Sequence, residues 1–391
     1  MEFSNRILKV KPSATLTINA KAGEMKAQGK NVISLAAGEP DFQPPEHVMQ
    51  AAHDAISQGL TRYTPVPGLP DLLDAVAGYF KKFYGLDIDK SMVVTTNGGK
   101  QGLYNLLQIL LNDKDEVLIP APYWVSYPDM VNLSDGKPVM VPTDPDRNFL
   151  TNPETLEQYL SSKTKVLILN SPSNPTGCHY TQDRFDKIVE WALEKGLFII
   201  SDEIYDQLVY PPAESTSATK WLDKAPKQVA VVNGLSKSFA MTGWRIGYVV
   251  SHADIIKNLS KIQGQSTSNI CSIVQKAALA ALQGSWDFLE EKRQNFIQRR
   301  DKALEIINSW SGAECPRPDG AFYVFPRLDS YYNEKVPDST ALCEYLLDKS
   351  EVALVPGAAF GDDRCVRFSY ALDEETMMTA MQRVGQALKD L

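Results

Sequence analysis

The stretch VAVVNGLSKSFAMTGWRIGYVV, residues 229–250, carries the pattern on which the fold prediction depends. It begins and ends with short apolar runs, residues 229–232 and 248–250, of the kind found in strands that are buried on both faces. Between the runs stand Lys237, five residues after the first run, and Arg245, eight positions further on. A lysine and an arginine in a loop directly after a buried strand make this stretch a candidate for chemistry.

Similar apolar runs recur earlier in the chain and alternate with helical patterns. The runs occupy residues 93–94, 117–119, 166–169 and 198–200. Leucines repeat at helical spacing over residues 103–111, and residues 185–193 carry another apolar stripe. Strands that alternate with helices indicate an α/β fold with a mostly parallel, doubly wound sheet.

The chemically interesting residues follow the predicted strands. In sheets of this kind, ligands bind beyond the C-terminal ends of the strands. Five polar or aromatic clusters occupy these positions, at residues 97–100, 121–124, 171–177, 202–205 and 233–237. We therefore expect the five clusters to converge on one crevice.

Composition narrows the class of protein. A net charge of −8 argues against non-specific binding of nucleic acid or acidic membranes, which requires clustered Lys and Arg. The five cysteines form no C-x-x-C pair, and this indicates neither a zinc site nor a redox motif. Residues 1–20 lack the features of a signal peptide, and no apolar run is long enough for a membrane helix. We expect a soluble, cytoplasmic protein without a metal.

Two of the clusters allow more than one interpretation. NGGKQGLYN, residues 97–105, places two glycines at the start of a helix, where backbone N–H groups could bind an anion. An ordinary glycine turn has the same sequence pattern. Asp202 ends a predicted strand and precedes Glu203 and Tyr205. Its carboxylate could pair with a protonated ring nitrogen or cap the next helix, whereas the absence of a nearby histidine disfavours a metal.

The basic residues also have a structural alternative. A desolvated lysine among cationic groups can have a lowered pKa and form an imine with a carbonyl, and Arg245 could supply that field and bind a phosphate. A single loop lysine is more often a solvated surface residue. Arg367 projects from the strand-like run VRFSYA, residues 366–371, and must meet an anion or a structural ion-pair partner. None of the four histidines lies in the clusters, and this disfavours a Ser-His-Asp hydrolase.

Together these motifs resemble the fold type I pyridoxal-phosphate enzymes, and more narrowly the class I aminotransferases. The resemblance rests on AAGEPDF (36–42), NSPSNPTG (170–177), SDEIYD (201–206), SKSFAMTGWRIGY (236–248) and VRFSYA (366–371). It implies a large domain with the doubly wound sheet, and a smaller α/β domain built from both chain ends. We predict an N-terminal arm and part of the small domain over residues 1–45, the large cofactor-binding domain over 46–290, and the rest of the small domain over 291–391.

The resemblance also implies roles for single residues around pyridoxal 5'-phosphate. Lys237 would be the Schiff-base lysine and the catalytic base, and Asp202 would keep the pyridine nitrogen protonated. The remaining cofactor contacts would come from Asn174 and Tyr205 at the ring hydroxyl, Trp124 on the ring face, and Gly98, Gly99, Lys100, Ser236 and Arg245 around the phosphate, with Tyr63 reaching in from a second subunit of a homodimer. Many relatives carry a phosphate-binding serine three residues before the lysine, where this chain has Gly234, so either Ser236 takes its place or backbone donors suffice.

For the substrate, the resemblance assigns Arg367 to the α-carboxylate, with Asn174, Trp124 and the backbone N–H of Gly38 beside it. KPSATLTINAKA, residues 11–22, and the lysine in GGKQ resemble the bacterial subgroup Ib of aspartate aminotransferases. In that subgroup the second carboxylate is received by residues that match Lys100, Ser13 and Thr15.

These assignments predict the transfer of the amino group of L-aspartate to 2-oxoglutarate in two half-reactions. One alternative is an aminotransferase that uses prephenate or an aromatic oxo acid as its acceptor. Two others are a lyase or synthase on the same fold, and a regulator built on an aminotransferase-like domain. The acidic chain and the short segment before residue 36 disfavour the regulator, which would carry a DNA-binding module there.

Overall fold

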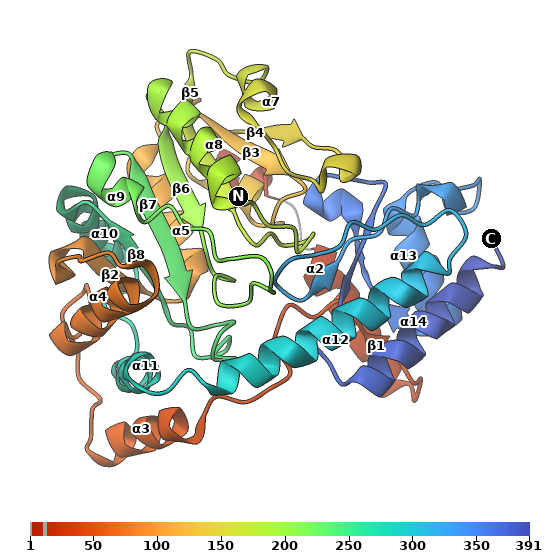
Figure 1. Ribbon diagram of the computed structural model, residues 1–391, viewed down its shortest axis with the longest axis horizontal. Coiled ribbons are helices and arrows are strands. Elements are labelled where there is room, and N and C mark those ends of the chain that lie inside the picture. The colour runs from red at the N-terminus through yellow and green to blue at the C-terminus, as the bar shows by residue number, and fades with distance from the viewer. Residues whose placement is uncertain (1, 11–13) are drawn as a thin grey trace.

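The computed structural model describes residues 2–10 and 14–391, and its largest element is a seven-stranded sheet (Figure 1). Its strands are β2 (Val93–Thr96), β3 (Glu116–Ala121), β4 (Lys137–Pro142), β5 (Thr164–Asn170), β6 (Phe198–Asp202), β7 (Val229–Gly234) and β8 (Gly247–Ser251). Their spatial order is β2-β8-β7-β6-β5-β3-β4, and only β8 runs antiparallel to its two neighbours. The predicted α/β class and mostly parallel sheet are confirmed.

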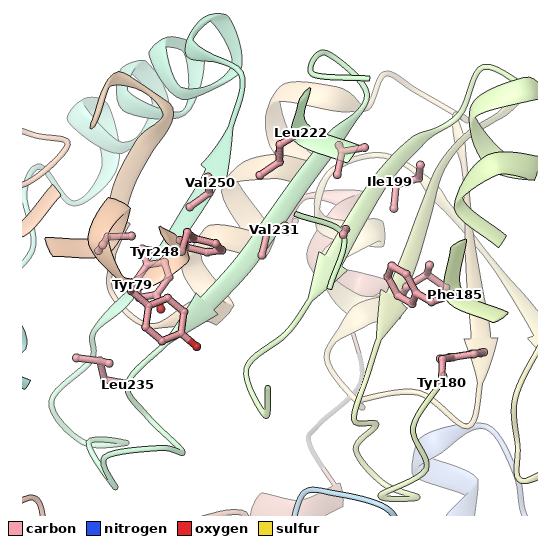
Figure 2. Packing of buried hydrophobic residues seen from close by; sticks show 14 of the residues in the cluster. Tyr79, Tyr180, Phe185, Ile199, Leu222, Val231, Leu235, Tyr248 and Val250 are labelled. Carbon is pink, nitrogen blue, oxygen red and sulfur yellow. The ribbon is translucent and has the colours of Figure 1, made fainter. Parts of the chain in front are cut away.

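Helices cover both faces of this sheet because successive strand residues point to opposite sides. Val231 of β7 packs in one buried cluster with Phe185 of α8 (Gln182–Glu194), whereas its neighbour Val232 packs in another cluster with Leu106 of α5 (Gly99–Leu110). Figure 2 shows the first of these clusters, in which Val231 and Ile199 lie on neighbouring strands.

Edge strand β4 is absent from the sequence prediction, for a physical reason. It contains Pro138 and Pro142, and its side chains are mostly exposed or half-buried. Proline cannot donate to a sheet ladder, so it is tolerated at an edge and weakens the sequence signal of a strand.

The remaining helices around the sheet follow the alternation expected of this fold. They are α3 (Glu46–Ser57), α4 (Pro70–Tyr84), α6 (Tyr127–Leu133), α7 (Pro153–Glu157), α9 (Trp221–Lys224), α10 (Ala253–Ser266) and α11 (Ser272–Gln283).

A second group of elements comes from the two ends of the chain. The 21-residue helix α12 (Phe288–Asn308) leads from the sheet to this group (Figure 1). The group contains α13 (Ser339–Ser350), α14 (Glu374–Leu388), β1 (Ile33–Ser34), β9 (Tyr323–Val324), β10 (Val352–Ala353), β11 (Val355–Pro356) and β12 (Val366–Ser369). The helices α1 (Asn5–Leu8) and α2 (Ala14–Ala27) precede β1.

Pairing between distant segments joins the two chain ends. Ile33 of β1 pairs with Val352 of β10, and β12 lies antiparallel between β11 and β9. The backbone N–H of Ser369 also donates to the carbonyl of Leu35 at 2.8 Å. The predicted domain boundaries at residues 45 and 290 stay a prediction. Over residues 2–10 and 14–391, none of the helices has the length and apolar character to span a bilayer.

Candidate active site

Glycines bring the start of α5 against the ends of β7 and β8. A Cβ atom on Gly247 would overlap the backbone of Gly98 and Gly99, and one on Gly234 would lie 2.8 Å from the Cα atom of Gly247. Only hydrogen fits at these positions, so the helix N-terminus sits directly on the strand ends. This also explains why residue 234 is a glycine, because a serine there would have no room for its side chain.

Lys237 projects from the loop after β7 into a crowded polar environment. Its Nζ donates to the carbonyl oxygen of Gly38 at 2.7 Å. Burial, helped by the nearby Arg367 and Arg245 and opposed by Glu39 and Asp202, lowers the pKa of Lys237 to about 8. The amine is therefore far more often neutral near pH 7 than an exposed lysine is, and a neutral amine is the form that attacks carbonyls and accepts protons.

Asp202 ends β6 and is buried, with 5% of its surface exposed. The hydroxyl of Tyr127 donates to Asp202 Oδ2 at 2.6 Å, and the backbone N–H of Ile204 donates to Oδ1 at 3.3 Å. Burial raises the pKa of Asp202 to about 6, against the lowering effect of Tyr127 and Lys237. A carboxylate accepts about four hydrogen bonds, so this group keeps the capacity to bind a cationic donor from a ligand.

Tyr127 is missing from the sequence prediction. It is fully buried at the start of α6, three residues after Trp124, and the two rings pack edge to face with centroids 5.4 Å apart. Its place directly after the 121–124 cluster is the signal that could have revealed it. An aromatic residue so close to a strand end can reach the crevice.

Arg367 extends from β12 and is 3% exposed. Its Nη1 donates to Asn174 Oδ1 at 3.0 Å and its Nη2 to the Ala36 carbonyl at 2.7 Å, while Nε is buried without a hydrogen-bond partner. No carboxylate in the described part of the chain forms an ion pair with Arg367. A buried guanidinium that lacks an anion is the expected state of a carboxylate-binding site.

Asn174 contacts this guanidinium directly, and Tyr205 is linked to it through Tyr323. Because Asn174 Oδ1 is taken by Arg367, its amide nitrogen is the part left to donate to a ligand. The hydroxyl of Tyr205 lies 2.9 Å from that of Tyr323 on β9, and burial raises the pKa of both phenols. Both are therefore neutral hydrogen-bond donors at physiological pH.

Arg245 lies at the N-terminus of α5. Its Nη2 donates to the Asn97 carbonyl at 3.1 Å and its Nη1 to that of Thr242 at 2.7 Å. A Cβ on Gly98 would overlap the guanidinium, so the glycine leaves room for it. The first N–H groups of a helix have no partner within the helix, and together with the arginine they form an anion-binding corner. Ser236 is buried next to Lys237.

Lys100 and Trp124 lie together at the same edge. Lys100 Nζ stands 4.8 Å from the Trp124 ring centroid, and removal from water together with Arg245 lowers the pKa of Lys100. A cation held over an aromatic face beside Arg245 can receive a second acidic group of a ligand. Ser13 and the side chain of Thr15, its predicted helpers, lie outside the described residues.

Gly38 and Tyr63 have different environments. The segment AAGEPDF crosses the crevice: Ala36 meets Arg367, Gly38 meets Lys237, and Glu39 accepts from the Thr242 hydroxyl at 2.8 Å. Tyr63, by contrast, is 90% exposed. The structure therefore joins the predicted residues from all five strand-end clusters, whereas Tyr63 protrudes from the molecule.

One histidine lies closer to the clusters than the sequence suggested. His179 Nδ1 lies 2.7 Å from the hydroxyl of Ser171, at the start of the loop that carries Asn174. His179 lies outside residues 171–177 in the sequence, but the chain returns toward β5 after Gly177 and brings the imidazole to Ser171. Its Nε2 lies 2.8 Å from the Glu214 carbonyl and both side chains are buried, so this pair braces the loop and is not an exposed nucleophile.

The arrangement fits a molecule with several distinct groups. It offers a nucleophilic amine, a buried carboxylate, a phenol, an anion-binding helix N-terminus and a guanidinium for a carboxylate, all at one end of the sheet. Among the described residues, no cluster of three or more His, Cys, Asp or Glu side chains could hold a metal ion.

Comparisons with known proteins agree with this chemistry. The family model for aminotransferase class I and II matches residues 30–384. The chain is 40% identical to the aspartate aminotransferase of Bacillus subtilis, over 98% of both chains. It is also 40% identical to a probable aspartate/prephenate aminotransferase of Aquifex aeolicus, over 100% of this chain and 99% of that protein.

A solved structure gives the same result at the level of the fold. The aspartate aminotransferase of Thermus thermophilus with maleate superimposes with a TM-score of 0.93 at 40% identity, over 99% of this chain and 100% of that one.

Proposed function

This chain belongs to the class I and II aminotransferases, and we propose that within this family it moves the amino group of L-aspartate to 2-oxoglutarate. The single observation that carries the proposal is the pairing of two acid-binding sites in one crevice. Arg367 is a buried guanidinium that forms no ion pair with a carboxylate of the described residues, and its Nε is unpaired there, while Lys100 lies over Trp124. Aspartate and 2-oxoglutarate each carry two carboxylates.

The residues present fit pyridoxal 5'-phosphate as the cofactor. Asp202 has spare acceptor capacity for a protonated ring nitrogen, and Tyr205 and Asn174 can donate to a ring hydroxyl. Gly98 leaves room for Arg245 at the start of α5, where a phosphate would bind. Lys237 would hold the aldehyde. When bound, the cofactor supplies an electron sink that stabilises negative charge at the substrate Cα.

The chain's own groups then have defined tasks. Arg367 binds the α-carboxylate and fixes the orientation of the Cα–H bond. Once the substrate amine has taken its place at the aldehyde, the freed Lys237 Nζ would remove the proton from the substrate Cα and later return a proton, because burial keeps its pKa near the working pH. Lys100 receives the distal carboxylate, and its flexible side chain suits acids of two lengths.

The decisive assay follows oxaloacetate formed from L-aspartate and 2-oxoglutarate, with saturating cofactor. We expect turnover by the wild-type protein and a loss of at least about 10³-fold in Lys237→Ala, which lacks the base. Lys220→Ala is the matched control, because Lys220 forms its ion pair with Asp186, away from the crevice. Absence of oxaloacetate with the wild-type protein would refute the proposal.

The substrate class is tested separately at Lys100. We expect Lys100→Met to lower kcat/KM for aspartate about tenfold or more, since a hydrogen bond to a charged group is lost, and to leave kcat/KM for alanine nearly unchanged. Equal losses with both amino acids would show that Lys100 does not select acids.

Prephenate is the second candidate acceptor, because the Aquifex aeolicus relative is named for both substrates. Comparing kcat/KM for prephenate and for 2-oxoglutarate, with aspartate as the donor, decides between the two acceptors.

We also propose a homodimer in which Tyr63 completes the phosphate site of the other subunit. Its 90% exposure supports a role in trans. If this is correct, mixing inactive Lys237→Ala with a weakened Tyr63→Phe protein generates hybrid dimers with one intact site, and activity rises above that of either variant. A mixture without such a gain would contradict the arrangement.

A further inference from the structure

Tyr323 of β9 lies where the two halves of the crevice meet. Its side chain is fully buried. Its hydroxyl is 2.9 Å from that of Tyr205, on the side of the crevice formed by the strand ends. The face of its ring lies 4.7 Å from the guanidinium carbon of Arg367, on the side formed by the C-terminal segments.

The residues around Tyr323 allow it to contact both Tyr205 and Arg367. Phe360 contacts the Arg367 guanidinium at 5.0 Å, so the cation is held by two aromatic rings as well as by Asn174 and Ala36. A Cβ atom on Gly38 would lie 3.1 Å from the Tyr323 hydroxyl. The absence of a side chain at Gly38 therefore lets the phenol reach Tyr205 beneath the segment that crosses the crevice.

The protons of the two phenols decide the direction of their hydrogen bond. Each neutral phenol has one proton to donate. If Tyr205 donates its proton into the crevice, its oxygen is left as the acceptor, and Tyr323 must be the donor between them. A phenol that accepts a hydrogen bond becomes a stronger donor, because chains of hydrogen bonds polarise one another.

We propose that Tyr323 is a positioning residue that serves both binding sites, its hydroxyl directing the Tyr205 proton toward the cofactor and its ring holding Arg367 ready for the substrate carboxylate. This inference rests on the proposed function. It adds a residue that touches neither substrate nor cofactor but determines the orientation of two groups that do.

The test separates hydroxyl from ring. Tyr323→Phe removes only the hydroxyl, whereas Tyr323→Leu also removes the aromatic face. The first readout is the pH at which the visible band of the bound cofactor changes, because a weaker donor at the ring hydroxyl favours the protonated chromophore. We expect Tyr323→Phe to move this transition upward by about half a pH unit, with KM for aspartate nearly unchanged.

Tyr323→Leu should show the upward shift as well, together with a rise of about tenfold in KM for aspartate, because Arg367 loses one aromatic neighbour. Tyr370→Phe is the matched control. Tyr370 is also buried and its hydroxyl lies 3.5 Å from the Ala321 carbonyl. Within the described part of the chain, no hydrogen bond or ring contact links it to Tyr205 or Arg367. We expect this variant to leave both readouts unchanged.

Two results would overturn the inference while leaving the proposed function intact: an unshifted transition in Tyr323→Phe, or the same shift in Tyr370→Phe. A wild-type protein that forms no visible band with pyridoxal phosphate and no oxaloacetate would instead overturn the proposed function, and the inference with it.

Discussion

Asp202 and Glu203 are consecutive buried carboxylates at the end of β6, yet they face different regions of the molecule. Asp202 faces the crevice, where Tyr127 is its close donor and Lys237 lies nearby. Glu203 faces the core. It accepts from the hydroxyls of Ser201 and Ser217 at 2.7 Å and from the backbone N–H of Ala218 at 2.8 Å.

The difference lies in how completely each carboxylate is satisfied. Glu203 has three short hydrogen bonds from its own chain, and Asp206, further along the same turn, accepts from the hydroxyls of Tyr79 and Tyr84. Asp202 has one short bond and one long one. Burial raises the pKa of all three. A buried carboxylate with a full set of donors stabilises the fold, whereas one with spare capacity points to a ligand.

The largest expected effect comes from changing the crevice carboxylate. Asp202→Asn replaces the charge that would hold a ring nitrogen protonated, and we expect kcat/KM for aspartate to fall by about 10²–10³-fold. Glu203→Gln, at the neighbouring position, should lose less than about tenfold, because it contacts no group of the crevice. Comparable losses of kcat/KM in the two variants would contradict the proposed difference between the crevice and the core.

The pH dependence of stability tests the difference between the two carboxylates at Glu203, in the core. Burial raises the pKa of Glu203 from 4.5 to about 7. The folded state thus holds the proton more tightly than the unfolded state, and the resulting stabilisation is present below pH 4.5 and is lost as the pH rises through 7. We expect this carboxyl to account for a decrease of about 3 kcal/mol in the free energy of unfolding.

Urea titrations between pH 4.5 and 8 measure this decrease. It should be smaller in Glu203→Gln, which has no proton to lose. Cofactor binding should leave unchanged the part of this decrease that comes from Glu203. It should remove the part that comes from Asp202, because the charge of Asp202 is then paired. An unchanged pH profile in Glu203→Gln would contradict this explanation.

Tyr127 offers a smaller test on the crevice side. Tyr127→Phe keeps the packing against Trp124 but removes the hydrogen bond to Asp202. We expect kcat to fall about tenfold, the cost of one hydrogen bond to a charged group, and the affinity for pyridoxal phosphate to fall with it. If steady-state kinetics and cofactor titration show no change, Tyr127 is only a packing residue.

The smallest expected effect lies at Tyr84, in the core network. Tyr84→Phe removes one donor to Asp206, and we expect a loss of about 1 kcal/mol of stability with kcat/KM unchanged. Urea unfolding and the aspartate assay measure the two quantities. A loss of activity without a loss of stability would mean that the two regions are coupled.

The sequence was informative about the sheet-borne half of the site and much less so about the other half. Lys237, Asp202 and Gly98 follow short, continuous apolar runs of the kind that indicate strands buried on both faces. Tyr323 belongs to a two-residue strand, too short for a periodic signal. Its role depends on the pairing of β9 with β12, a tertiary contact that local sequence does not encode.

Edge strand β4 and His179 were missed for similar reasons. Prolines weakened the strand pattern of β4, and the contact between His179 and Ser171 arises only from the return of a loop. Arg367, in contrast, was singled out because an arginine in an alternating apolar strand must meet an anion or an ion-pair partner, and the family resemblance favoured the anion.

The hydrogen bond from Arg367 to the Ala36 carbonyl joins residues 331 positions apart in the chain. At a translation rate of about 5–20 residues per second, a ribosome needs on the order of half a minute between making the first of these residues and making the second. In the last part of that interval, after Lys237 has been made, the sheet can fold without the guanidinium that we propose binds the substrate carboxylate. A nascent chain could thus acquire a reactive amine before it acquires specificity, and the delay places substrate recognition among the last features to form during synthesis.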